Sequence, residues 1–393
     1  MTPAEKKILT LTTAAHGLVH LYEGVLPPLI PLLMADYSTD YFHLGIVVSV
    51  FSYAFGLGSL PTGYLADRVG PRRLITIFLF GSGISAMLVG GVGSLVSYGL
   101  VMGLVGLFCS TYHPASNTLI ALAVREKGKG FGIHGIAGSL GVATVPVVSA
   151  SLGSLFGWRA PHVLFGLMGI VVGCFSLTVS NARPAVPKTS LAEEGGGPRT
   201  RVHFLHLGVF FLSAMALGLT YKGIMTFLPA YLGERVQLSF VRLDTVALGG
   251  TVATLALLSG AVGQYLAGRL TDYYKPEKLY FISIAMGTIF VFVMASASNL
   301  LLVAAAVIYA LFYFAAQPIQ NYLLSRYVPR QRQGLGYGIH FFLSFGVGST
   351  AAAVAGWLAD RFGLVAVFQF TGVCFLVASG LALFLMLKAP DRP

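Results

Sequence analysis

The chain has 393 residues, of which 56% are hydrophobic and only 10% are charged, and its mean hydropathy is +0.80. A soluble domain of this size could not bury so many apolar side chains away from water. The composition therefore predicts an integral membrane protein. The formal net charge of +11 would suggest a nucleic-acid partner in a soluble protein, but the placement of the charges leaves no support for one.

The sequence predicts an all-α membrane protein. A helix needs roughly 20 residues to cross about 30 Å of hydrocarbon, and twelve apolar segments are that long. A polar stretch at 181–202 divides them into two sets of six, which predicts two six-helix bundles, 1–180 and 203–393, joined by a linker at 181–202. The predicted helices cover 8–33, 43–66, 74–93, 97–123, 131–156, 161–180, 204–232, 245–270, 279–297, 299–325, 334–359 and 364–387.

The basic residues predict the orientation. If the N-terminus is cytoplasmic, all but five of the 25 lysines and arginines fall on the cytoplasmic side or in its loops. Such an excess marks the cytoplasmic loops of membrane proteins, so we expect both termini in the cytoplasm. The exceptions are Arg159, Arg235, Arg242 and Arg361 on the opposite side, and Lys222 within the seventh helix.

The first helix carries His16, His20 and Glu23, spaced i, i+4 and i+7. This spacing puts all three on one helical face. Polar groups at membrane depth are costly, so the face is expected to look into a cavity. Glu23 is the only carboxylate predicted near the middle of the bilayer, where burial would favour its uptake of a proton.

The loop after the second helix holds Gly63, Asp67 and Arg68, followed by a glycine and a basic pair. An aspartate at a helix end can accept charge-assisted hydrogen bonds from an arginine and from the N-terminus of a facing helix, and the glycine permits close approach. These residues therefore predict a cytoplasmic latch whose release favours an inward-open state. A weaker copy, ending in Asp272, follows the eighth helix.

The two halves repeat each other at offsets of 204 to 206 residues. A duplicated membrane bundle places a substrate site between halves that rock against each other, so the repeat predicts a transporter. His134 and His340 are the last residues of one matching pair of segments, and each lies at the same depth near the cytoplasmic start of its helix. They could be gate or proton-relay residues or, equally, helix-start residues that are hydrogen-bonded to loop carbonyls. The pairs are Gly130–His134 with Gly336–His340, Gly63–Asp67 with Gly268–Asp272, and His113–Asn117 with Gln317–Asn321.

The loop pattern, the twelve helices and the six-plus-six repeat together resemble the major facilitator superfamily over the whole chain. This resemblance implies the major facilitator fold, two pseudo-symmetric six-helix bundles, with helices one, four, seven and ten around a central cavity. Besides the first-helix residues, including His16, it implies substrate-cavity positions for Tyr112, His113, Asn117, Tyr221, Lys222, Gln317, Gln320 and Asn321.

Tyr112-His113-Pro114, the glycines of the fifth helix and the first-helix histidines look similar to the fosmidomycin-resistance type of facilitator, a branch of bacterial efflux carriers. That resemblance implies proton-driven antiport, drug efflux and residence in the bacterial inner membrane. The fifth helix departs from the antiporter pattern, because Val145 stands where a glycine would precede Pro146.

These observations predict a proton-coupled secondary transporter of a small anionic or zwitterionic compound, and the resemblance to the efflux branch implies that it is an antiporter that exports this compound. Lys222 would attract the anion, and Glu23 would carry the proton with His20 and His113. No enzyme, cofactor or nucleic-acid partner is expected; the partners are the substrate, protons and the lipid bilayer, and we expect a monomer.

Two alternatives stay open. One is a proton-coupled importer of an organic anion. The other is a divalent-metal carrier that uses His16, His20, Glu23 and His113, whose side chains suit transition metals. A fixed ammonium at Lys222 in the same cavity would oppose a dication.

Overall fold

The computed structural model describes residues 1–125, 127–179, 204–237, 243–271, 273–328 and 333–388. Within these ranges all regular structure is helical, and twelve helical segments are long and apolar enough to cross a membrane. The prediction of an all-α protein with twelve membrane-spanning helices is confirmed.

Two of the first six spans are interrupted. Pro27 and Pro28 break the first, and the fourth breaks just before Pro114, because proline cannot donate the backbone hydrogen bond that would continue the helix. The spans are formed by α1 (Pro3–Gly24), η1 (Pro27–Leu29) and α2 (Ile30–Tyr37); α3 (Tyr41–Val69); α4 (Pro71–Leu88) and η2 (Val89–Gly91); α5 (Leu95–Cys109) and α6 (Tyr112–Ala123); α7 (Lys127–Phe156); and α8 (Arg159–Leu177).

In the second set the eleventh span is the irregular one. It contains a π-helical turn. Such turns are rare in proteins overall, but those that occur are often found at functional sites. The elements are α9 (Phe204–Arg235), α10 (Thr245–Leu270), α11 (Pro276–Ser296), α12 (Asn299–Tyr327), α13 (Gln333–Phe341), the π-turn η4 (Phe342–Gly346), η5 (Val347–Ser349), α14 (Thr350–Phe362) and α15 (Leu364–Lys388).

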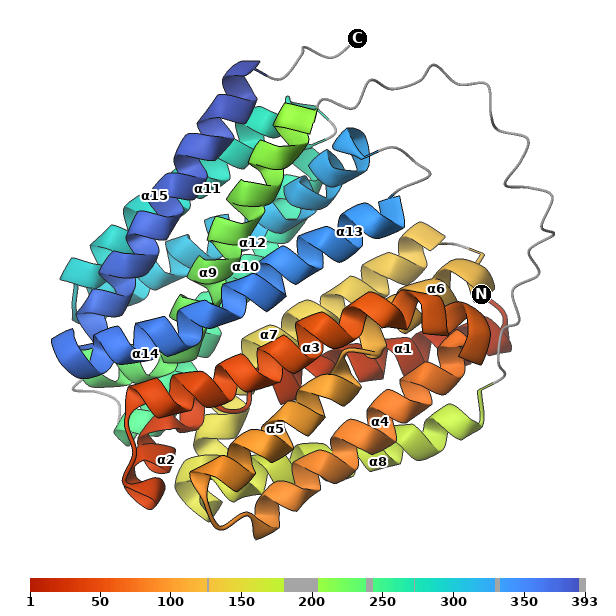
Figure 1. The fold of residues 1–393 in the computed structure, drawn as a ribbon, viewed down its shortest axis with the longest axis horizontal. Coiled ribbons are helices and arrows are strands. Elements are labelled where there is room, and N and C mark those ends of the chain that lie inside the picture. Colours follow the sequence, from red (N-terminus) through yellow and green to blue (C-terminus); the bar gives the residue numbers. More distant parts are fainter. Residues whose placement is uncertain (126, 180–203, 238–242, 272, 329–332, 389–393) are drawn as a thin grey trace.

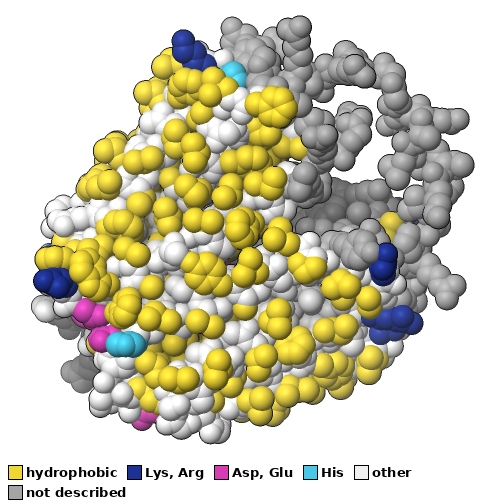
Figure 2. Space-filling view, in the orientation of Figure 1, with side chains coloured by type: hydrophobic (Ala, Val, Ile, Leu, Met, Phe, Trp, Pro, Cys, Tyr) yellow, Lys and Arg dark blue, Asp and Glu magenta, His cyan; other side chains and the backbone are white. Residues whose placement is uncertain are grey.

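The helices lie in two groups, which we call the first half (α1–α8) and the second half (α9–α15) (Figure 1). The halves touch where α7 packs on α10 and α3 packs on α14. Hydrophobic side chains cover the face seen in Figure 2, as expected of a surface that meets lipid, and its charged side chains lie near the ends of the helices. The domain limits 1–180 and 203–393 remain a prediction, since the linker at 181–202 lies wholly outside the described residues.

The two ends of the molecule differ. We call the end where α1 and α9 begin the N-terminal face, and the end where α3 begins and α14 ends the distal face. At the distal face the backbone N–H groups of Tyr41 and Phe42 donate to the two carboxylate oxygens of Asp360, at 2.9 and 2.8 Å. The Tyr41 hydroxyl donates to Glu234 at 2.9 Å. Residues of the second half therefore cap the first turn of α3, and we call these four residues the distal latch.

Two glycines allow the backbones to meet beside the distal latch. A Cβ at Gly45 would collide with the carbonyl of Ala352, and one at Gly356 would collide with the carbonyl of Tyr41. Gly356 and Asp360 share the spacing of Gly63 and Asp67, so the same short pattern occurs at the opposite end of the molecule. The sequence analysis did not identify this copy.

The latch predicted at the N-terminal face stays a prediction. Asp272 lies outside the described residues, the side chain of Asp67 is not described, and Arg68 is exposed there; the role of Gly63 likewise stays a prediction.

Asp360→Ala should loosen the distal latch, because it removes two charge-assisted hydrogen bonds between the halves. We expect electron-spin distance measurements between labels at Val96 and Leu300, both exposed near the distal face, to shift to longer distances. The native cysteines would be replaced by alanine in this background. Asp40→Ala is the matched control, since the carboxylate of Asp40 bonds His43 of α3 itself and no residue of the second half in the described contacts. Unchanged distances in Asp360→Ala would refute the latch.

Candidate functional site

A cavity of about 370 Å³ lies between the two halves, within the size range of small-molecule sites. Both halves contribute polar side chains to its wall. The predicted residues that line it are His16, His20, Glu23 and His113 from the first half, and Tyr221, Gln317, Gln320, Asn321 and His340 from the second.

A buried ion pair joins the halves at the edge of this cavity. The Lys222 ammonium lies 2.7 Å from one carboxylate oxygen of Glu23, and His20 Nδ1 donates to the other oxygen at 3.2 Å. The side chains of Lys222 and Glu23 are only 6% and 12% exposed. If either side chain left this buried pair, the charge of the other would be uncompensated, which costs free energy. The two side chains therefore keep each other in position.

Lys222 does not line the main cavity. It borders a smaller adjoining pocket, and Glu23 lines both spaces. The ammonium also lies 5.5 Å from the ring centroids of Tyr221 and Phe345, whose faces attract a cation. Glu23 therefore separates the Lys222 charge from the main cavity.

Close packing of α1 on α7 fixes the first-helix histidines. His16 Nδ1 donates to the backbone carbonyl of His134 at 2.7 Å, and the two rings stack with centroids 4.1 Å apart. A side chain at Gly138 would collide with the His16 ring, and one at Gly141 would lie 2.9 Å from the carbonyl of Gly17. The glycines of the fifth span thus let the helices approach, as in other membrane bundles.

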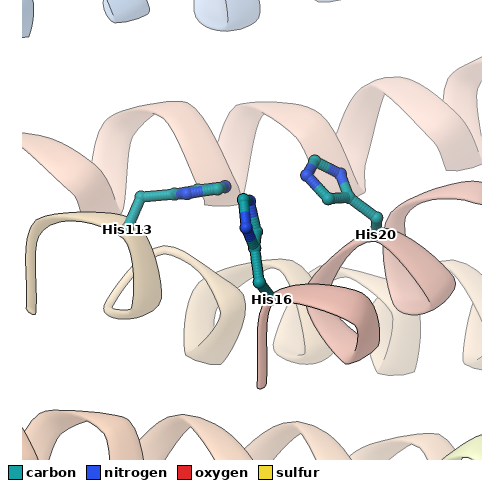
Figure 3. A group of neighbouring side chains, drawn as sticks. All are labelled: His16, His20 and His113. Carbon is teal, nitrogen blue, oxygen red and sulfur yellow. The ribbon is translucent and has the colours of Figure 1, made fainter. Parts of the chain in front are cut away.

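His113 completes a cluster of three imidazoles on the cavity wall (Figure 3). His16 lies between the other two, with ring centroids 5.1 Å from His20 and 5.3 Å from His113. One ring nitrogen from each histidine can be chosen so that all three atoms lie within 4.8 Å of one another. The prediction that α1 and the fourth span present histidines to one cavity agrees with this geometry.

The second half supplies amides and tyrosines. Gln264 accepts from Ser139 at 2.9 Å and donates to Gln317 at 2.8 Å, which carries a hydrogen-bond chain from one half to the other. Gln320 donates to the Tyr280 hydroxyl at 3.1 Å. Sequence reasoning missed Ser139 and Gln264, although a polar side chain in an otherwise apolar span was the available signal.

Two predicted cavity residues lie elsewhere. Tyr112 is fully buried and its hydroxyl donates to the carbonyl of Thr12 at 2.6 Å, because adjacent residues of a helix point about 100° apart and His113 takes the cavity side. Asn117 is exposed on α6 and is not among the lining residues. Their prediction as substrate-cavity residues does not agree with this structure.

His134 and His340 occupy similar settings in the two halves. Each is buried and stacks on a ring of the first helix of its own half, His134 on His16 and His340 on Phe210. In each ring Nδ1 has no hydrogen-bond partner among the described residues. Only His340 lines the cavity, and the gate or relay role of the pair stays a prediction.

A helical bundle with a polar cavity between two halves is the architecture of a secondary transporter. Residues 12–352 and 243–393 match the family model of the Major Facilitator Superfamily, and the chain belongs to that superfamily. Transport across a membrane, rather than catalysis, is the activity of this family and fold.

Among curated proteins, the chain is 24% identical over 376 residues to a probable L-galactonate transporter of Escherichia coli, covering 88% of this chain and 82% of that protein. It is 25% identical over 270 residues to a probable galactarate/D-glucarate transporter of Bacillus subtilis. That match covers 60% of this chain and 58% of the relative, less than two thirds of its length.

Among solved structures, a bacterial homologue of the human lysosomal transporter Spinster, in an inward-facing and unoccupied conformation, superposes with a TM-score of 0.81. The match covers 100% of both chains at 16% identity, so it supports the fold alone.

At alkaline pH, where Glu23 does not readily take up a proton, Lys222→Ala should lower the free energy of unfolding by about 3 kcal/mol, because it leaves a buried carboxylate without its cation. The double variant Glu23→Gln, Lys222→Met should recover most of that loss, since neither charge remains. Thermal unfolding in detergent measures both. A double variant no more stable than Lys222→Ala would contradict this account of the pair.

Proposed function

We propose that the protein carries a small organic anion across the bacterial inner membrane by alternating access, coupled to proton movement. The observation that carries the proposal is the ion pair between Glu23 and Lys222, which joins the halves beside the cavity. Among the described residues, Lys222 is the one lysine or arginine that borders either of the two adjoining spaces, the main cavity and the smaller pocket, and its present partner is a carboxylate, the group that an organic acid would offer.

The pair explains how the anion and a proton would be coupled. A substrate carboxylate that reaches Lys222 displaces Glu23, which is then a buried carboxylate without its cation. Proton uptake by Glu23 removes that cost. His20, which donates to Glu23, and His113 beside it give the proton a path from the cavity.

Anion binding and proton uptake then favour each other, which is symport. The names of the relatives, transporters of galactonate and of galactarate or glucarate, also support an organic acid. Antiport, the first prediction from the sequence, requires instead that the anion and the proton exclude each other. The efflux branch suggested by the fosmidomycin-resistance resemblance stays a prediction.

We propose that the N-terminal face is cytoplasmic. Lys6, Lys7 and Arg73 are exposed at that face, as basic residues of cytoplasmic loops are. The distal latch then closes the outer side of the cavity, and the predicted latch around Asp67 would close the inner side in the alternate state. That the working unit is a monomer stays a prediction.

Uptake into proteoliposomes tests the proposal. Purified protein is reconstituted, and radiolabelled L-galactonate and D-glucarate are offered at pH 6 outside against pH 8 inside, then with the gradient reversed, then with a protonophore. Symport predicts uptake only when the outside is acidic. Uptake only into acidic vesicles indicates antiport, and movement of neither acid nor of a wider panel of organic acids would refute the anion-carrier proposal.

Glu23→Gln should abolish uptake driven by a pH gradient and retain binding of the anion, because Lys222 remains and its competitor has lost its charge. The double variant Glu23→Gln, Lys222→Met should lose binding as well, by at least about tenfold in Kd, as expected for loss of one charge-assisted contact. Binding is measured by calorimetry in detergent, with His43→Gln, an exposed distal substitution, as the control. If Glu23→Gln still showed gradient-driven uptake at the wild-type rate, a residue other than Glu23 would have to carry the coupled proton.

A further inference from the structure

We propose that His16, His20 and His113 form a binding site for a divalent transition-metal ion of the Zn²⁺ class on the wall of the cavity. The three rings come from two elements of the first half, α1 and α6, and all three line the same space. This site does not depend on the proposed anion transport, and its metal need not be cargo.

The hydrogen bonds of two rings fix which nitrogen is free. His16 Nδ1 faces a backbone carbonyl, which can only accept, so Nδ1 carries the proton. His20 Nδ1 faces the Glu23 carboxylate, which is paired with Lys222 and also accepts. In the neutral rings Nε2 of both histidines is therefore an unprotonated acceptor. Metal-binding histidines have this arrangement, with the second nitrogen bonded to a carbonyl or a carboxylate.

The three rings are close enough for a metal to draw them together. Zn–N bonds of about 2.1 Å place the ligand atoms of a tetrahedral site about 3.4 Å apart, and one ring nitrogen from each histidine can be chosen so that all three lie within 4.8 Å of one another. Metal binding would therefore require the side chains to move closer by about 1 Å. Imidazole is a preferred ligand of Zn²⁺, Ni²⁺ and Cu²⁺, and three histidines with a fourth position open toward a cavity are a known type of zinc site.

The charge of Lys222, which counted against a metal in the sequence analysis, is screened in the structure. The ammonium borders the smaller pocket and contacts the far oxygen of Glu23, while the near oxygen contacts His20. A negative carboxylate thus stands between the ammonium and the histidines. The Glu23 carboxylate accepts a hydrogen bond from Nδ1 of His20. This bond makes Nε2 of the same ring a better ligand for a metal cation.

The test is a titration of the full-length protein in detergent with Zn²⁺, followed by calorimetry, and with Co²⁺, followed by visible absorption. We expect a site that is filled by Zn²⁺ at micromolar concentration and gives Co²⁺ a tetrahedral spectrum. His113→Ala and His20→Asn should each weaken Zn²⁺ binding at least about tenfold. His43→Ala, which removes the exposed distal histidine, should leave the cavity site unchanged.

Two variants are used because either could disturb packing, and the melting temperature without metal shows whether each is folded. His16 is avoided, because its ring packs on Gly138 and stacks on His134. Equal Zn²⁺ affinity in wild type, His113→Ala and His20→Asn would overturn the proposal. So would an octahedral Co²⁺ spectrum, or Zn²⁺ binding that only His43→Ala removes.

Discussion

The buried contact between Glu23 and Lys222 is the constraint on which the rest of the site depends. It is an attraction between opposite charges that water hardly reaches, and its two partners belong to different halves of the molecule. The polar wall around it follows from this contact, since Glu23 orients His20 and Lys222 sits against aromatic faces. Such an interaction is strong when both partners are present and costly when one is missing, so a change at either residue affects the whole wall.

Much of the fold could be predicted because the bilayer imposes one rule along the whole chain. Apolar segments of sufficient length were expected to be helices, and the described part of the chain contains twelve of them. The histidines and Glu23 of the first helix could also be predicted to face inward, because their spacing and the cost of polar groups in lipid permit little else. The helix breaks at Pro28 and near Pro114 were not predicted, since Pro61, Pro146, Pro229 and Pro318 lie inside helices that continue past them.

Other parts of the site could not be read from the sequence. Tyr112 and His113 are equally polar neighbours, and only packing decides that one bonds the carbonyl of Thr12 while the other faces the cavity. The bridge from Ser139 through Gln264 joins spans whose distance no periodicity reveals. Likewise, Lys222 was predicted from the sequence to line the cavity, whereas in the structure Glu23 lies between Lys222 and the cavity.

The distal latch has a consequence for how the protein can vary. Its two donors are backbone N–H groups of residues 41 and 42, which every amino acid except proline provides, whereas its acceptor is one particular side chain. Substitutions of residues 41 and 42, other than to proline, would therefore leave these two hydrogen bonds in place. Most substitutions of Asp360 would remove them. These two bonds depend on a single carboxylate of the second half, whereas the remaining bond of the distal latch, from the Tyr41 hydroxyl to Glu234, depends on a side chain at each end.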